Sequence, residues 1–203
     1  MIEKLIILII GSCLGFSFAI LKDWINERGR LKSEQYYLAI IVTAYLENFL
    51  SKCTEVVCDN GKLDAEGERR VTAEQPELSL IDLDVNWKSL DKELLYDLLL
   101  IPEKVNDAKL KVSEAIEYAY NPPDFDEIFD ERKLQYSKVG LLVCSLIERL
   151  RNTCNLPEKE ASKWSFEQVF NEVKTEVETS IKNRKRIQCD TDKKLMRSIE
   201  KDK

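Results

Sequence analysis

The sequence predicts an all-α protein in which an N-terminal transmembrane helix continues through a stalk into an α-helical bundle of four to five helices. Three observations support this fold class. Residues 5–21 contain no charged side chain, although charged residues make up 33% of the chain. Glycine and proline are scarce, with 6 and 5 residues, which favours helix over strand. Apolar residues elsewhere recur at three- and four-residue spacings, which indicates amphipathic helices.

The uncharged segment, residues 5–21, has the length of a short membrane span. A helix of this length extends about 25 Å, close to the thickness of the bilayer core. We therefore predict a retained transmembrane anchor over residues 1–22. Two alternatives stay open, because Ser17-Phe18-Ala19 resembles a signal-peptidase site and Cys13 follows a short apolar run, as in a lipoprotein.

Basic residues predict the orientation of this anchor. One lysine precedes the uncharged segment, and four basic residues follow it within eleven positions. Because Lys and Arg stay preferentially on the cytoplasmic side, we expect the N-terminus outside and the rest of the chain in the cytoplasm. Lys22, Trp24, Arg28 and Arg30 are then predicted to lie at the membrane interface.

Small residues recur every four positions within the anchor, at Gly11, Gly15 and Ala19. This spacing places them on one helix face, where a second membrane helix could approach closely. The face therefore predicts membrane-helix packing, either between two copies of the chain or with another protein. The alternative is that glycine and alanine are simply common in membrane helices.

The remaining chain divides by composition. Residues 23–34 are charged and predict a helical stalk, and residues 35–187 predict the bundle domain. Residues 36–57 form its expected central helix, because residues 36–46 are apolar nearly all round, and Asp59-Asn60-Gly61 ends it. A polar, aperiodic stretch at 59–85 predicts a long mobile loop, and residues 188–203 predict a basic disordered tail.

Three further helical regions follow the loop. The first opens at Trp87, is kinked or divided at Pro102, and ends at Asn121-Pro122-Pro123. The second begins near Asp124 and ends at Asn155-Leu156-Pro157, with an apolar stripe that only Arg132 interrupts. The last begins after Ser165, a good helix cap, and carries apolar residues as far as Ile181. No segment predicts a strand.

Residue usage excludes several functional classes. The chain has no histidine, which removes the commonest general base and metal ligand. Its six cysteines include no C-x-x-C pair, so we expect reduced thiols. No catalytic or cofactor-binding motif is recognisable, and no cofactor is expected. Residues 182–203 contain nine basic and four acidic residues, a net charge of about +5, so residues 1–181 carry about −11. Because binding to phosphates requires clustered Lys and Arg, this acidic balance makes nucleic acid an unlikely partner.

Two charged clusters are candidate sites. The acidic cluster contains Asp126, Glu127, Asp130 and Glu131, where i,i+4 pairs of carboxylates share a helix face and could hold a hard cation. The alternative is that these acids complement the helix dipole, and histidine ligands are lacking. The basic cluster contains Lys182, Arg184, Lys185 and Arg186, which could face anionic lipid or belong to a solvated C-terminus.

Residues 85–90 (Val-Asn-Trp-Lys-Ser-Leu) and 121–132 (Asn-Pro-Pro-Asp-Phe-Asp-Glu-Ile-Phe-Asp-Glu-Arg) resemble a group of uncharacterised bacterial proteins. Those proteins carry a short N-terminal membrane anchor and a cytoplasmic helical domain, and their function is unknown. The resemblance covers most of the chain from the anchor to about Pro157. It implies a bacterial inner-membrane setting, and it brings no activity, cofactor or catalytic residue.

The functional expectation follows from this architecture. We expect a membrane-tethered helical interaction or scaffold protein that binds a protein partner or itself, such as an accessory in stress response or phage defence. The alternative is a subunit or regulator of a larger membrane complex. A metal-dependent enzyme built on the acidic cluster is the third possibility.

Overall fold

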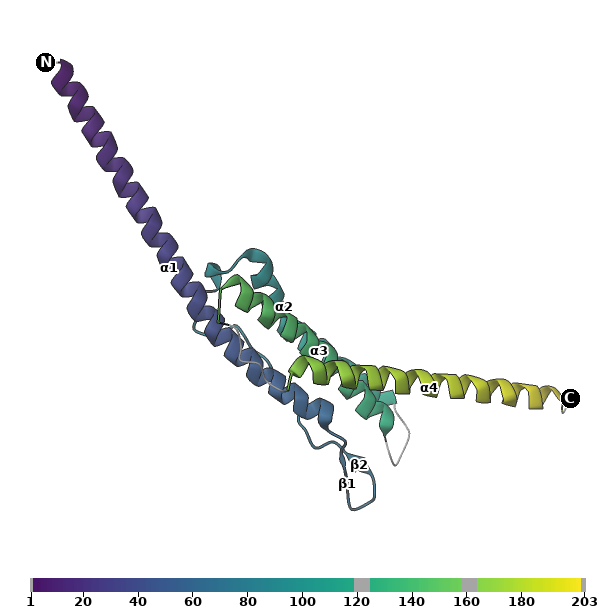
Figure 1. Cartoon of the computed structure of the whole chain (residues 1–203). Coiled ribbons are helices and arrows are strands. Elements are labelled where there is room, and N and C mark those ends of the chain that lie inside the picture. The colour runs from purple at the N-terminus through teal and green to yellow at the C-terminus, as the bar shows by residue number, and fades with distance from the viewer. Residues whose placement is uncertain (1, 119–124, 158–163, 202–203) are drawn as a thin grey trace.

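The computed structural model describes residues 2–118, 125–157 and 164–201, and within these it leaves aside the side chains at 2–15, 19, 195 and 198–201. Four helices pack as a bundle in the described residues (Figure 1): α1 (Ile2–Cys58), α2 (Lys92–Tyr118), α3 (Asp126–Thr153) and α4 (Phe166–Lys201). This arrangement confirms the all-α fold class.

Helix α1 is a single helix of 57 residues, about 85 Å long, and its N-terminal half projects from the bundle (Figure 1). Every described side chain from residue 16 to residue 33 is exposed. Contact with the rest of the chain begins at Glu34, whose carboxylate accepts a hydrogen bond from the Asn86 side-chain amide, and continues at Gln35, whose amide donates to the Ser89 carbonyl. The helix ends at Cys58, immediately before the predicted Asp59-Asn60-Gly61 terminator.

None of the described helices combines the length and apolarity that crossing a membrane requires, so the predicted transmembrane span is not found in this structure. The described side chains of the predicted span are those of residues 16–18, 20 and 21, and Lys22 follows directly. The predicted packing face of Gly11, Gly15 and Ala19 lies outside the described side chains.

The helix at the centre of the bundle is α3, which packs against α1, α2 and α4. The prediction that residues 36–57 form the central helix is therefore wrong. One face of that segment is open to solvent, with Tyr37 57% exposed and Ile40 45% exposed. The central position of α3 was not predicted because its buried surface includes polar residues, namely Arg132, Gln135 and Ser137.

Helix α2 begins after Asp91, whose carboxylate accepts hydrogen bonds from the backbone N–H groups of Glu93 (3.1 Å) and Leu94 (2.9 Å). This is a side-chain N-cap. The helix then continues through Pro102, so the expected division at this residue is wrong. Its buried side includes Val105, Ala108 and Val112, which recur at three- and four-residue spacings.

Helix α3 ends in a Schellman turn. The N–H of Leu156 donates to the Arg151 carbonyl at 2.9 Å, and Asn155 takes the left-handed conformation with φ 53°. Helix α4 begins at Phe166, one residue after the predicted cap, and reaches Lys201. The predicted disordered tail is thus helical as far as Lys201, because no glycine or proline follows Pro157 to end the helix.

The segment between α1 and α2 contains a pair of short antiparallel strands, β1 (Lys62–Leu63) and β2 (Arg69–Arg70), and a 3₁₀ turn, η1 (Trp87–Ser89). The sequence predicted no strand and a mobile loop here. Instead, the segment covers part of the core, since Leu80 is fully buried and Leu78 is 9% exposed. The burial of Leu78 and Leu80 was not predicted because polar residues surround them in the sequence.

Candidate functional site

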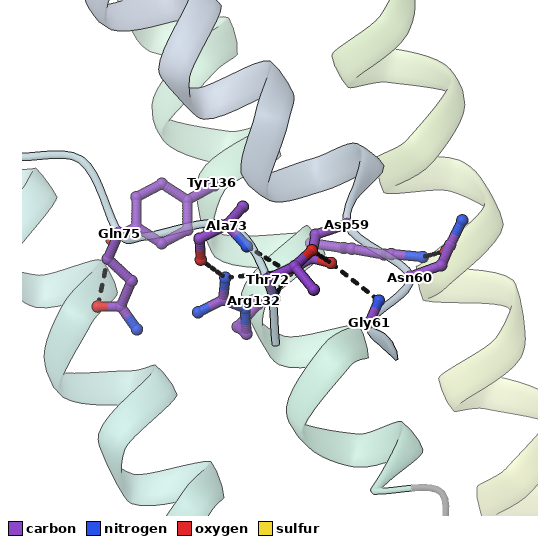
Figure 2. A network of polar contacts seen from close by, with 9 residues as sticks. Asp59, Asn60, Gly61, Thr72, Ala73, Gln75, Arg132 and Tyr136 are labelled. Atoms are coloured by element: carbon purple, nitrogen blue, oxygen red, sulfur yellow. Dashed lines mark hydrogen bonds and ion pairs between the residues drawn. The ribbon is translucent and has the colours of Figure 1, made fainter. Parts of the chain in front are cut away.

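The most extensively hydrogen-bonded side chain in the interior is Asp59, which follows the last residue of α1 (Figure 2). Its carboxylate accepts hydrogen bonds from the N–H groups of Gly61 (2.8 Å), Thr72 (2.8 Å) and Ala73 (2.9 Å). The Thr72 hydroxyl donates a fourth bond at 2.7 Å. One carboxylate therefore joins the end of α1 to the segment that follows β2.

Helix α3 reaches the same carboxylate through Arg132 (Figure 2). The guanidinium lies 3.7 Å from Asp59 and donates a hydrogen bond of 2.7 Å to the Ala73 carbonyl. Both side chains are almost completely buried, at 4% and 2% exposed. We call Asp59, Gly61, Thr72, Ala73 and Arg132 the Asp59 network.

Neighbouring α3 residues extend this attachment. The Tyr136 hydroxyl donates to the Gln75 side-chain oxygen at 3.4 Å, and the Lys133 ammonium donates to the Asn60 side-chain oxygen at 2.6 Å. Two nearby residues of α3 thus contact the chain on both sides of the β1–β2 pair, at Asn60 before β1 and at Gln75 after β2. The arrangement fixes the loop on the bundle.

The ionisation states in the network are fixed near neutral pH. Burial acts to raise the pKa of Asp59, but hydrogen bonds from Ala73, Thr72 and Gly61 outweigh it and lower the pKa to about 2. Burial lowers the pKa of the Arg132 guanidinium, and the Asp59 carboxylate acts in the opposite direction. Burial also raises the pKa of Tyr136. These three groups are therefore poorly suited to proton transfer near pH 7, and the arrangement is that of a structural attachment.

One of the two charged residues of this network could be recognised in the sequence. Arg132 was recognised as the one interruption in the apolar stripe of its helix, and a charge at such a position indicates either a surface break or a buried pair. Its partner lies 73 positions earlier, at the end of another helix. Periodicity within one helix cannot identify such a partner, so the pair was missed.

Two members of the predicted acidic cluster pair with basic residues from other elements. Asp126 contacts Arg69 of β2 at 2.5 Å, Asp130 forms an ion pair with Arg184 of α4, and Glu131 accepts a hydrogen bond from Gln135 at 2.7 Å. In the described ranges, no group of three or more Asp, Glu, Cys or His side chains could hold a metal ion. The suggestion of a metal site at Asp126, Glu127, Asp130 and Glu131 is therefore not supported, because the carboxylates diverge to separate partners.

The predicted basic cluster is divided by its position on α4. Arg184 faces α3 and pairs with Asp130, whereas Lys182, Lys185 and Arg186 are exposed. Figure 1 places the C-terminal end of α4 far from the N-terminal end of α1. The expected contact of this cluster with anionic lipid stays a prediction.

The predicted interface residues lie on the projecting part of α1. The Arg28 guanidinium stacks 3.6 Å from the centroid of the Trp24 ring, and Arg30 forms an ion pair with Glu27 at 2.7 Å. Lys22 and Trp24 are exposed, and Trp24 is 51% accessible. The structure thus shows an aromatic and basic group at the boundary between the apolar end of α1 and its charged stalk.

A groove of about 410 Å³ lies where α1, α3 and the start of α4 meet. The sequence did not predict it, because its walls come from three separated segments. Trp164 and Phe166 form one wall, with ring centroids 4.6 Å apart in an edge-to-face arrangement. The groove is lined by Glu47, Leu50, Cys144, Ile147, Glu148, Arg151, Trp164, Ser165, Phe166 and Glu167.

The cysteines agree with the prediction of reduced thiols where the structure describes them. Cys53, Cys58, Cys144, Cys154 and Cys189 form no disulfide. Cys53 is fully buried beside α3, and burial raises the pKa of its thiol. Cys13 lies outside the described side chains.

Comparison of this chain with models of protein families, with curated proteins and with solved structures finds no match in any of the three. The resemblance to uncharacterised membrane-anchored bacterial proteins therefore stays a prediction. Arguments about function rest on the geometry described above.

Proposed function

We propose that this protein is a membrane-tethered helical interaction protein, whose bundle is held at the cytoplasmic face of a bacterial inner membrane by the start of α1. One observation carries the proposal. Large apolar side chains are exposed on α1 where it projects from the bundle, with Phe16 70% and Phe18 69% accessible. Ile20, Leu21, Trp24 and Ile25 are about half exposed. In the described residues nothing covers them, and exposed apolar clusters of this kind mark membrane or protein contacts.

The stalk supports a tether of defined length. Residues 22–33 are helical, exposed and largely charged, and the bundle begins directly after them. Twelve residues of helix extend about 18 Å. The bundle would therefore lie roughly 20 Å from the membrane surface, within reach of the cytoplasmic parts of other membrane proteins.

The interior of the bundle supports an interaction role rather than catalysis. Its buried charges, Asp59 and Arg132, are paired and hold a loop in place. The groove at the start of α4 and the projecting half of α4 instead offer surfaces to a partner. Tethering raises the local concentration of such surfaces, so a weak contact can be effective.

A subunit of a larger membrane complex is the second candidate, favoured by the open face of α1 next to the stalk. Tyr36, Tyr37 and Ile40 are 42%, 57% and 45% exposed there. A partner helix leaving the same membrane would pass beside this face. Loss of the partner after Tyr37→Lys/Ile40→Lys, with full membrane retention, would favour this alternative.

Membrane fractionation tests the proposal. We expect the full-length chain to stay with membranes after an alkaline carbonate wash, because apolar contacts survive conditions that remove peripheral proteins. Deletion of residues 2–21 should release the chain into the soluble fraction. Recovery of the full-length chain in the carbonate supernatant would contradict the proposal.

A further inference from the structure

The C-terminal half of α4 and the groove at its start have complementary chemistry. The residues that line the groove include two carboxylates, Glu148 and Glu167, and one guanidinium, Arg151. Arg151 donates a hydrogen bond to the Pro157 carbonyl, so its charge is directed toward the end of α3. The apolar floor is formed by Leu50, Ile147 and Phe166. The groove therefore suits an amphipathic, basic segment.

The projecting half of α4 is such a segment. From residue 185 to residue 197 every described side chain is exposed, with Ile187 62% and Met196 68% accessible. Basic residues outnumber acidic ones from residue 182 onward by nine to four, whereas the rest of the chain is acidic. Figure 1 shows the C-terminal end of α4 extending away from α1, α2 and α3.

The helix cannot place this half in its own groove. Phe166 and Glu167, at the start of α4, line the groove, and the helix then runs without interruption to Lys201. Ile187 lies 21 residues further along, which is about 30 Å of helix. A continuous helix does not turn back on itself, so only the groove of another copy can receive it.

We propose that the projecting half of α4 of one copy docks into the groove of a second copy, which produces a head-to-tail assembly. The inference rests on the proposed interaction function and names its partner as the chain itself. Such a contact joins two different surfaces, so each copy can bind one neighbour through its groove and another through its helix. Copies held in one orientation by a membrane would meet at high local concentration.

Charge reversal on the full-length chain, purified in mild detergent, tests this contact. We expect wild type to form oligomers that grow with protein concentration and dissociate at high salt, measured by light scattering coupled to size exclusion. Glu148→Lys/Glu167→Lys should weaken association about tenfold or more, because like charges would face each other. Lys193→Glu/Lys194→Glu should have the same effect, and the chain with all four changes should recover association.

The matched control reverses two exposed acids away from the groove, Glu103→Lys/Glu114→Lys, and should leave association unchanged. A second measurement uses native thiols, since Cys144 lines the groove and Cys189 is exposed on the projecting half of α4. A bifunctional maleimide should link Cys144 of one copy to Cys189 of another, as identified by mass spectrometry.

Several outcomes would overturn the inference. These are a wild-type chain that stays monomeric at low salt, oligomers that survive both charge reversals, or a four-change chain that does not recover. Retention of the same variants in membranes after a carbonate wash is measured independently of their self-association. A chain that stays in membranes but does not self-associate refutes the head-to-tail contact alone, and a chain that self-associates but washes off membranes refutes the tether alone.

Discussion

We expect the two charged residues of the Asp59 network, Asp59 and Arg132, to contribute unequally to the free energy of unfolding. Replacing Asp59 by Ala removes the acceptor of four hydrogen bonds, at 2.7 to 2.9 Å, and leaves the buried Arg132 guanidinium without its counter-charge. Each hydrogen bond to a charged group is worth about 1.5–3 kcal/mol, and breaking a buried pair costs about 3–5 kcal/mol. These terms overlap, so we expect the free energy of unfolding to fall by about 3–5 kcal/mol.

Replacing Arg132 by Met should cost less. At 3.7 Å the attraction to Asp59 is about 4 kcal/mol for an effective dielectric constant of 20. Removing a buried guanidinium also removes a desolvation penalty of several kcal/mol, and Met fills much of the same volume. The two terms nearly cancel, while Asp59 keeps its four donors. We therefore expect a loss of about 1–2 kcal/mol, mainly from the Ala73 carbonyl left without its donor.

Urea unfolding followed by far-ultraviolet circular dichroism, on the full-length chain in mild detergent, measures both losses. The reasoning predicts that Asp59→Ala is the more destabilising change, and that Arg132→Met retains most of the wild-type stability. An Arg132→Met loss equal to or larger than that of Asp59→Ala would refute it. That result would mean that the ion pair, rather than the backbone donors, holds the loop.

The same network predicts an acid dependence. The folded pKa of Asp59, about 2, is below its ordinary value of 3.8, so its carboxylate stabilises the fold fully above the ordinary value and progressively less as the pH falls through 2. The shift corresponds to roughly 2–3 kcal/mol. Asp59→Asn cannot titrate, so its deficit relative to wild type should shrink by this amount between about pH 5 and pH 2. A deficit that stays constant over that range would contradict the assigned cause.

Two further predictions concern packing and thiol reactivity. A Cβ atom at Gly140 would lie 2.5 Å from the Phe170 ring, so Gly140→Ala should cost about 1–3 kcal/mol by separating α3 from α4. The control is Gly29→Ala, because a Cβ atom at Gly29 would have no neighbour within 4 Å; this change should be neutral or stabilise the stalk by up to about 1 kcal/mol. Equal effects of Gly140→Ala and Gly29→Ala in thermal melts would refute the close contact between Gly140 and Phe170. Exposed Cys189 should react with a maleimide under native conditions, whereas buried Cys53, whose pKa burial raises, should react only on unfolding. Rapid native labelling of Cys53 would show that α1 and α3 separate.

Local features of the fold could be predicted because their signals are local. The end of α1 was marked by Asp59-Asn60-Gly61, and Gly61 takes φ +73° in the turn that follows the helix. The start of α4 was marked by Ser165 in the same way. These signals depend on a few adjacent residues and on backbone sterics. Such signals therefore do not depend on how distant parts of the chain pack.

Features that depend on contacts between elements could not be predicted. The central position of α3 depends on buried polar residues such as Arg132 and Ser137, whose polarity alone would assign them to the surface. The groove combines Leu50, Cys144 and Trp164 from three segments, and no spacing relates them. The acidic and basic clusters were each visible in the sequence, but their contact through Asp130 and Arg184 was not.

The central claim, that the start of α1 enters a membrane while the bundle stays clear of it, is tested most directly by tryptophan quenching. The full-length chain would be reconstituted into vesicles of brominated lipid, with Trp24 as its only tryptophan after Trp87→Phe/Trp164→Phe. The matched control keeps Trp164, in the groove of the bundle, in place of Trp24. We predict strong quenching of Trp24 and little quenching of Trp164. Quenching of Trp24 no greater than that of Trp164 would contradict the tether.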